Sequence, residues 1–206
     1  MKKIYRTGVL CLVGCMILAG AYRYRRYRIQ TDIAERILRF HVIANSDTKE
    51  DQDLKLKVRD KIGAYLGEEL AKVSGLEECE RVVNSHLTEI EACAKEVIVR
   101  EGYDYSVRAN IKDADFPKKT YGSYTFPKGT YRALKVEIGS GMGKNWWCVM
   151  YPNLCFAGSV YEVEDEKSQK ELQAVLTEED YAEIMAEGKI KVKFKYFDAF
   201  LSLFSD

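Results

Sequence analysis

Few side chains in this sequence could do nucleophilic, acid–base or metal chemistry. The 206 residues include only two histidines, His41 and His86, which do not form an HxxxH pair, and the six cysteines contain no CxxC pair. Metal sites in proteins use such spacings, so we expect neither a metal nor another cofactor. The best catalytic candidate is Cys148 with His41 as its base, because a thiol needs a base to form the reactive thiolate.

A disulfide bond would remove that candidate. Cys148 and Cys155 enclose a short loop around Pro152, and they are the natural pair in an oxidising compartment. Two reduced thiols packed as small apolar groups are the alternative. Cys79 and Cys93 fall in one predicted helix, roughly 21 Å apart along its axis, which is beyond the reach of a disulfide.

Two further kinds of enzymatic site are weakly indicated. The run GSGMGK at 139–144 could offer backbone N–H groups and Lys144 to a phosphate. It lacks the Walker spacing, and Asn145 stands where Ser or Thr would bind magnesium, so we interpret the run as a flexible hinge. A carboxylate pair that cleaves glycosides has no sequence spacing of its own, so an exported cysteine or carboxylate hydrolase acting on the cell wall stays an alternative function.

The most unusual aromatic stretch is GKNWWCVMYPNLCF at 143–156. We predict an exposed loop whose aromatic side chains form an anchor for a partner protein, because tryptophan in a preorganised loop gives a large contact area at low entropic cost. The predicted contact residues are Trp146, Trp147, Tyr151 and Phe156. A core tryptophan beside a partly covered one, or a loop that dips into a membrane, are the alternatives.

A second predicted contact patch lies where a strand meets a helix, at His41, Asn45, Ser46 and Asp47. Its structural alternative is a helix cap plus a strand residue, since Ser46 or Asp47 could cap the helix that follows.

The N-terminus has the pattern of an export signal. Basic residues in MKKIYR precede an uncharged stretch at 7–22 that is shorter than the roughly 20 apolar residues of a membrane helix. Ala19-Gly20-Ala21 has the small-x-small form of a cleavage site, which predicts cleavage after Ala21. An uncleaved anchor is the main alternative, because YRYRRYR at 22–28 suits a membrane interface; Leu12 to Cys15 also looks like a lipoprotein box.

Either main interpretation places the rest of the chain outside the cytoplasm. The formal net charge is zero, and loss of the three basic residues before the apolar stretch leaves about −3, so we expect no nucleic-acid partner.

The predicted elements place these residues in one α+β domain. Alternating apolar residues predict strands, and apolar residues three and four apart predict amphipathic helices. The predicted strands cover 36–44, 105–112, 121–125, 134–138 and 189–197, and the predicted helices cover 48–71, 76–102 and 177–188. We expect an antiparallel sheet with two long amphipathic helices packed on it, after an N-terminal export segment at 1–21 and a basic-aromatic linker at 22–35.

Three phrases carry a resemblance to a known family: LRFHVIANSD at 38–47, EDQDLKLKVRDKI at 50–62, and the aromatic stretch at 143–156. Together they resemble the stage II sporulation protein R family of endospore-forming bacteria, over roughly residues 36 to 156. The resemblance implies a signalling protein and not an enzyme.

Members of that family are secreted from the forespore into the space between forespore and mother cell. There they trigger a membrane-embedded aspartic peptidase, which cleaves the leader from pro-sigma-E in the mother cell. The expected partner is therefore that peptidase, with membrane contact through the N-terminal segment. A membrane-tethered adaptor is a further alternative function.

Overall fold

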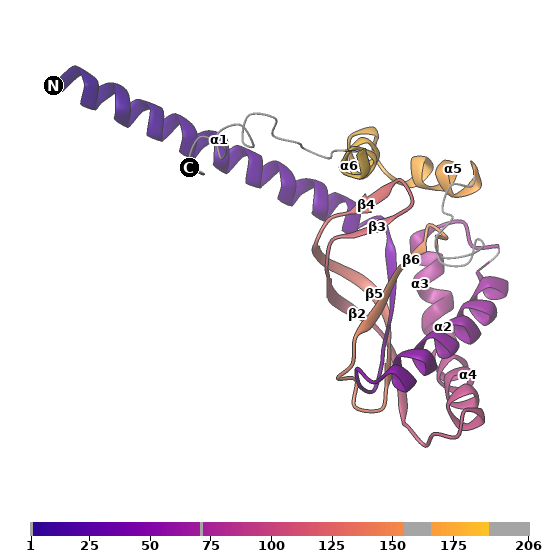
Figure 1. The fold of residues 1–206 in the computed structure, drawn as a ribbon. Coiled ribbons are helices and arrows are strands. Elements are labelled where there is room, and N and C mark those ends of the chain that lie inside the picture. The colour runs from indigo at the N-terminus through magenta and orange to yellow at the C-terminus, as the bar shows by residue number, and fades with distance from the viewer. Residues whose placement is uncertain (1, 71, 155–165, 190–206) are drawn as a thin grey trace.

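The structure is a computed structural model that describes residues 2–70, 72–154 and 166–189. Its centre is a four-stranded sheet in the order β2-β5-β1-β6 (Figure 1). The strands are β1 (Leu38–Ile43), β2 (Val107–Phe116), β5 (Gly129–Ile138) and β6 (Asn145–Tyr151). β1 runs parallel to β5 and antiparallel to β6, and β2 runs antiparallel to β5. The predicted α+β class is confirmed, although the parallel β1–β5 pair was not expected.

A small hairpin of β3 (Lys119–Tyr121) and β4 (Tyr124–Phe126) forms a second sheet between β2 and β5. The prediction of one strand at 121–125 was wrong, because Gly122 has a φ of 54° and the chain reverses there. Both β2 and β5 extend beyond their predicted ends towards this hairpin.

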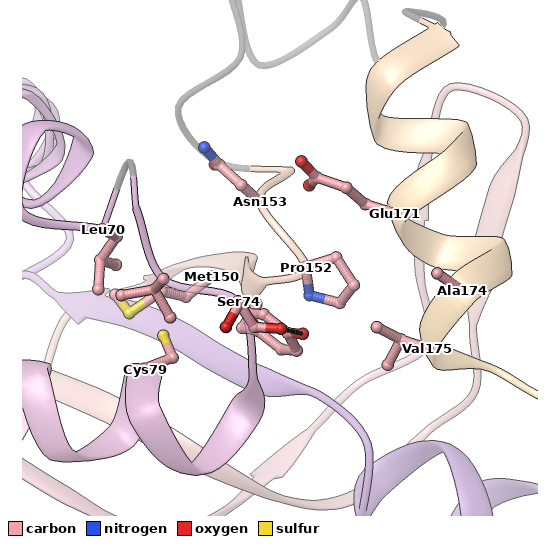
Figure 2. A pocket seen from close by; sticks show the side chains of 11 residues that line it. Leu70, Ser74, Cys79, Met150, Pro152, Asn153, Glu171, Ala174 and Val175 are labelled. Carbon is pink, nitrogen blue, oxygen red and sulfur yellow. Dashed lines mark hydrogen bonds between the residues drawn. The ribbon is translucent and has the colours of Figure 1, made fainter.

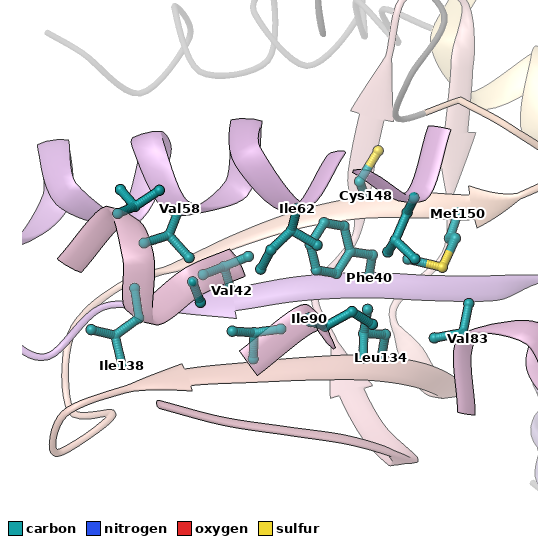
Figure 3. Packing of buried hydrophobic residues seen from close by; sticks show 14 of the residues in the cluster. Phe40, Val42, Val58, Ile62, Val83, Ile90, Leu134, Ile138, Cys148 and Met150 are labelled. Carbon is teal, nitrogen blue, oxygen red and sulfur yellow. The ribbon is translucent and has the colours of Figure 1, made fainter. Parts of the chain in front are cut away.

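Three helices cover one face of the sheet (Figure 1): α2 (Lys49–Glu69), α3 (Leu76–Ser85) and α4 (Leu87–Arg100). Their apolar residues, such as Ile62 and Ile90, meet Phe40, Val42 and Leu134 of the sheet in a fully buried core (Figure 3). This packing is what the spacing of apolar residues along the helices predicts, since each helix buries one stripe.

The predicted single helix at 76–102 is two helices. The backbone leaves the helical region at His86, whose N–H donates to the Val83 carbonyl. Cys79 therefore lies on α3 and Cys93 on α4, and both thiols are free. The expectation that these two cysteines are not a pair is confirmed, although the expected reason, a single long helix, was wrong.

A second core lies on the opposite face of the sheet. It includes Ile29 and Ile33 from the end of α1 (Lys2–Ala34), Phe126 from the hairpin, and residues of α5 (Glu166–Val175) and α6 (Glu178–Lys189). The Asp180 N–H donates to Thr177 Oγ1, which confirms the predicted cap of the helix at 177–188. The helix α5 was not predicted.

The N-terminal helix α1 extends well beyond the sheet (Figure 1). The predicted linker at 22–35 lies within α1, where Arg25 and Arg26 form ion pairs with Glu179 and Glu183 of α6. Among the described residues, no helix combines the length and the apolar character that crossing a membrane requires. The predicted edge strand lies outside the described residues except for Lys189.

Candidate functional site

The residues predicted to contact a partner do not form one surface. Trp146 and Trp147 belong to the strand β6 and not to a loop, so their side chains lie on opposite faces of the sheet. Tyr151 lies at the far end of the same strand, and Phe156 is outside the described residues. The structure does bring together Trp147 of the predicted aromatic anchor and His41 of the second predicted contact patch.

Trp147 lies flat on His41, with ring centroids 5.0 Å apart and an interplanar angle of 9°. Its edge meets Phe116 at 4.6 Å. Trp147 is partly exposed, whereas His41 beneath it is 3% exposed. Burial, followed by the positive charge of Lys135, lowers the pKa of His41 to about 4, so the imidazole is neutral at neutral pH.

Trp146 lies on the helix-covered face. Its ring contacts Phe40 edge-on at 5.5 Å, and the Arg59 guanidinium lies 5.0 Å from the ring centroid. This tryptophan is partly buried against the main core. Packing and a cation–π interaction are enough to explain a tryptophan at this position. For Trp146, the structure therefore agrees with the alternative in which one of the two tryptophans packs against the core.

The residues of the second predicted patch do not lie together. His41 packs against Trp147, whereas Asn45, Ser46 and Asp47 form hydrogen bonds where β1 leads into α2. Asn45 and Ser46 both donate to the carboxylate of Asp51, at 2.9 and 2.6 Å. Burial would raise the pKa of Asp51, but hydrogen bonds from Ser46, Asn45 and Tyr105 outweigh it and lower the pKa. The cap of α2 is Thr48, which accepts from the Asp51 N–H, so the prediction of Ser46 or Asp47 as the cap was wrong.

This corner also holds the glycine-rich loop between β5 and β6. The Ser140 N–H donates to Asn45 Oδ1 at 2.9 Å, and the Lys144 N–H donates to Asp47 Oδ1 at 2.7 Å. A side chain at Gly143 would put its Cβ 2.2 Å from the Ser46 carbonyl oxygen. The loop is therefore bound to the β1–α2 corner, and the interpretation as a flexible hinge was wrong.

Tyr151 is one of the residues that line a pocket of about 280 Å³. Figure 2 shows this pocket between Cys79 of α3 and Glu171, Ala174 and Val175 of α5. Its hydroxyl donates to the Ser74 carbonyl at 3.2 Å. Cys79 forms part of the pocket wall, and burial, with the nearby Glu80, raises the pKa of its thiol to about 12. That thiol is protonated at physiological pH and is a poor nucleophile.

The candidate catalytic pair of Cys148 and His41 is contradicted by the geometry. Cys148 is fully buried and disulfide-bonded. In the β1–β6 register it stands opposite Phe40, whereas His41 stands opposite Trp147, so the thiol position and the imidazole lie on different faces. Cys155 is outside the described residues, and its pairing with Cys148 stays a prediction. Within the described ranges, no three or more His, Cys, Asp or Glu residues could hold a metal ion.

Sequence reasoning missed Arg39, which is fully buried on the same face as His41. Its Nε donates to the Cys148 carbonyl at 2.9 Å, and its Nη2 donates to the Tyr121 hydroxyl at 3.1 Å. The guanidinium also lies 4.4 Å from the Phe116 ring centroid. The Tyr121 hydroxyl in turn donates to the Trp147 carbonyl, so Arg39 and Tyr121 hold β6 in place behind the exposed tryptophan.

The sheet face around Trp147 is also lined by residues that were not predicted. One row of neighbours crosses all four strands in the order Asn110, Lys135, His41 and Trp147. We call the part of this face from that row to the β5–β6 loop, together with the exposed Lys112 just beyond the row on β2, the open half-face. No described helix or hairpin strand lies over it (Figure 1). Alternation within β2 and β5 could have assigned Asn110 and Lys135 to one side of each strand, but not to the same surface.

The family model of stage II sporulation protein R matches residues 34–161. This chain belongs to the stage II sporulation protein R family. A curated relative, the stage II sporulation protein R of Bacillus subtilis (strain 168), is 34% identical over 190 residues, which cover 85% of this chain and 84% of that protein. No solved structure matches the chain.

The stage II sporulation protein R match spans the whole sheet, its three covering helices and the hairpin. Most of α1 and both α5 and α6 lie outside it. The family membership supports a role in sporulation for this chain, and it agrees with the resemblance seen in the three sequence phrases. The Trp147–His41 stack and the Asn45–Asp47 corner both lie inside the matched region.

Proposed function

We propose that this member of the stage II sporulation protein R family is an exported signal that activates a membrane-embedded aspartic peptidase. That peptidase then removes the leader of pro-sigma-E in the mother cell. The observation that carries the proposal is membership of the family across residues 34–161. The export pattern of the N-terminus supports it, because a signal secreted from the forespore must cross its membrane.

The proposed contact with the peptidase is the surface around Trp147. An activator shifts a peptidase only by binding its active arrangement more tightly than its inactive one. The partly exposed Trp147 is held by a stacked His41 and by Phe116 at a steep angle. Because its side chain is already ordered before binding, a contact through it costs less conformational entropy. Trp146 is no longer part of the proposed anchor, since it packs on the opposite face.

The test is a reconstitution in a host that does not sporulate. The full chain would be exported in cells that also make pro-sigma-E and the membrane peptidase from the same genome as this chain. We expect pro-sigma-E to be shortened only when both proteins are present, as measured by immunoblot. Processing that needs only the peptidase, or none at all with the exported chain present, would contradict the proposal.

Two matched variants then test the contact surface. Trp147→Leu removes the indole from the exposed face, while Trp146→Leu makes the same change on the helix-covered face. We expect Trp147→Leu to lower the rate of processing by about tenfold or more, as for a central interface residue, at equal amounts of exported protein. Trp146→Leu should leave the rate per folded molecule unchanged, and equal losses in both variants would count against the Trp147 surface.

A further inference from the structure

The open half-face is a sheet surface that the described part of the chain leaves without a covering layer. On the other half of the same face, the hairpin residues Tyr121 and Phe126 pack over the second core. Figure 1 shows that hairpin and α1 at one end of the sheet only. A sheet face normally packs against another layer or is solvated and mostly polar. The open half-face combines exposed cationic side chains with the partly exposed Trp147.

The charge of this surface is strongly one-sided. Arg108 and Lys112 of β2 are exposed and make no ion pair among the described residues. Lys135 of β5 is the third cation, and its Nζ lies 2.6 Å from a carboxylate oxygen of Glu137. Glu137 is the only acidic residue that the described strands place on this patch. The charges of Arg108, Lys112 and Lys135 interact with the carboxylate of Glu137. The charges of Lys112, Lys135 and Glu137 also act on His41. The patch is therefore net positive on a chain whose formal net charge is zero.

Polar atoms within the same surface also lack partners. Both ring nitrogens of His41 and Oδ1 of Asn110 are buried without a hydrogen bond in the described structure. Such atoms are rare in folded proteins, because each costs about as much as a lost hydrogen bond. His41 is almost wholly buried, and its ring lies directly beneath the indole of Trp147.

We infer that the open half-face docks an acidic polypeptide segment that carries aromatic side chains. The carboxylates would face Arg108, Lys112 and Lys135, and the aromatic rings would contact Trp147. This inference rests on the proposed function in one respect, since it assigns a chemistry to the segment that the activated partner presents. A charge-complementary partner both speeds encounter and fixes its orientation.

A polypeptide fits this surface better than a lipid bilayer does. The indole of Trp147 is held flat on His41 and edge-on against Phe116, so it does not project as a side chain must to enter a membrane. No residue of the open half-face belongs to the strongly exposed large apolar residues of the described chain. Met142, which is 84% exposed, belongs to the β5–β6 loop that borders this surface.

Docking of carboxylates would also change His41. Burial lowers its pKa most, the charges of Lys135, Lys112 and Arg39 lower it further, and the charge of Glu137 raises it. Further negative charge close to the ring favours the imidazolium, so the pKa of His41 should rise above its value of about 4 when an acidic segment binds. The change is measurable by NMR titration of the His41 ring signals with and without the acidic segment.

The binding test uses the full chain and a fluorescently labelled random copolymer of glutamate and tyrosine. The first variant, Arg108→Gln with Lys112→Gln, removes two exposed charges from the open half-face. Its matched control, Lys57→Gln with Lys61→Gln, removes two charges from α2 on the other side of the sheet. We expect the first variant to bind the copolymer roughly fivefold more weakly or worse, and the control to bind as the unchanged chain does.

Two further probes test whether binding of the acidic copolymer has another cause, such as its tyrosine residues or a general affinity for anionic surfaces. A copolymer of lysine and tyrosine should not bind, and vesicles of phosphatidylglycerol should not bind in a way that depends on Arg108 and Lys112. The inference is overturned if both double variants bind the acidic copolymer equally, or if the basic copolymer binds as well. Vesicle binding that needs these two cations, without copolymer binding, would instead make the surface a lipid site.

The failure of this inference is distinct from failure of the proposed function. A chain that triggers pro-sigma-E processing but ignores the acidic copolymer loses only the assigned chemistry of the partner. A chain that binds the copolymer through Arg108 and Lys112 but never triggers processing loses only the role as an activator.

Discussion

His41 and Arg39 are neighbours on one side of β1, and both place a polar group where water does not reach. Arg39 compensates with two hydrogen bonds and a set of aromatic rings around its guanidinium. His41 has no such compensation among the described residues. It therefore remains neutral, and its protonation must oppose folding.

The stability of this protein should fall as the pH is lowered from about 6.5 to about 4. The folded pKa of His41 is below its unfolded value, so the unfolded chain binds the proton more readily and gains stability relative to the native state. The full effect of this pKa shift on the free energy of unfolding is about 3 to 4 kcal/mol at most. Urea unfolding at several pH values would measure the effect.

The matched variant is His41→Phe, which keeps an aromatic ring in contact with both Trp147 and Phe116. Over pH 7 to 5 it should lose less stability than the unchanged chain, since the same carboxylates titrate in both. Parallel stability curves over this interval would show that His41 is not buried as a neutral ring.

At the scale of elements, the turn from β1 into α2 organises the neighbouring loop from β5 to β6. The carboxylate of Asp51 accepts from Asn45 and Ser46, and Asn45 in turn accepts from the Ser140 N–H of the loop. One buried carboxylate thus sets the geometry of two connections. The loop precedes β6, so it also sets where Trp147 emerges on the sheet.

Replacing Asp51 by Asn should lower the free energy of unfolding by about 2 to 3 kcal/mol, because charge-assisted hydrogen bonds are lost in a buried site. The control is Asp53→Asn on the same helix, where the carboxylate is exposed and pairs with Lys49; that change should cost less than about 1 kcal/mol. Equal costs in urea unfolding would show that the buried network contributes nothing special. Hydrogen exchange at Ser140 and Lys144 should also accelerate in Asp51→Asn.

At the scale of the whole molecule, α1 changes character along its length. Side chains near its start, such as Leu10 and Leu18, are about 70% exposed, whereas Ile29 and Ile33 are buried in the second core. Arg25 and Arg26 attach the same part of the helix to α6. The folded body therefore uses the second half of α1 and not the first.

A chain that begins at Tyr22 should unfold at the same urea concentration as the full chain. A chain that begins at Glu35 should lose at least about 3 kcal/mol, because removal of Ile29 and Ile33 leaves a gap in the second core. Equal stability of the two truncated chains would contradict the role of α1 in that core. N-terminal sequencing of exported material tests separately whether the first residue is Tyr22.

Local pattern alone was enough for several elements. The spacing of Leu54, Val58 and Ile62 predicted α2, the alternation around Phe40 predicted β1, and Thr177 marked the start of α6, because such signals depend on a few adjacent residues. The expectation that Cys79 and Cys93 are not paired with each other was also correct. For the candidate site, the sequence singled out His41 and Trp147, but as members of two separate patches.

The sequence by itself determined which side of each helix and strand is apolar, and hence that the chain forms an α+β domain. The segments around His41 and Trp147 also indicated its family. Only the tertiary structure decided that β1 lies between β5 and β6, that Trp146 and Trp147 face different layers, and that the Asn110–Trp147 row forms one surface. The physical reason is that periodicity records the burial of a face but not the identity of its neighbours. Strand order is set by packing between residues far apart in the chain, and no short segment of the sequence indicates which distant residues will pack together.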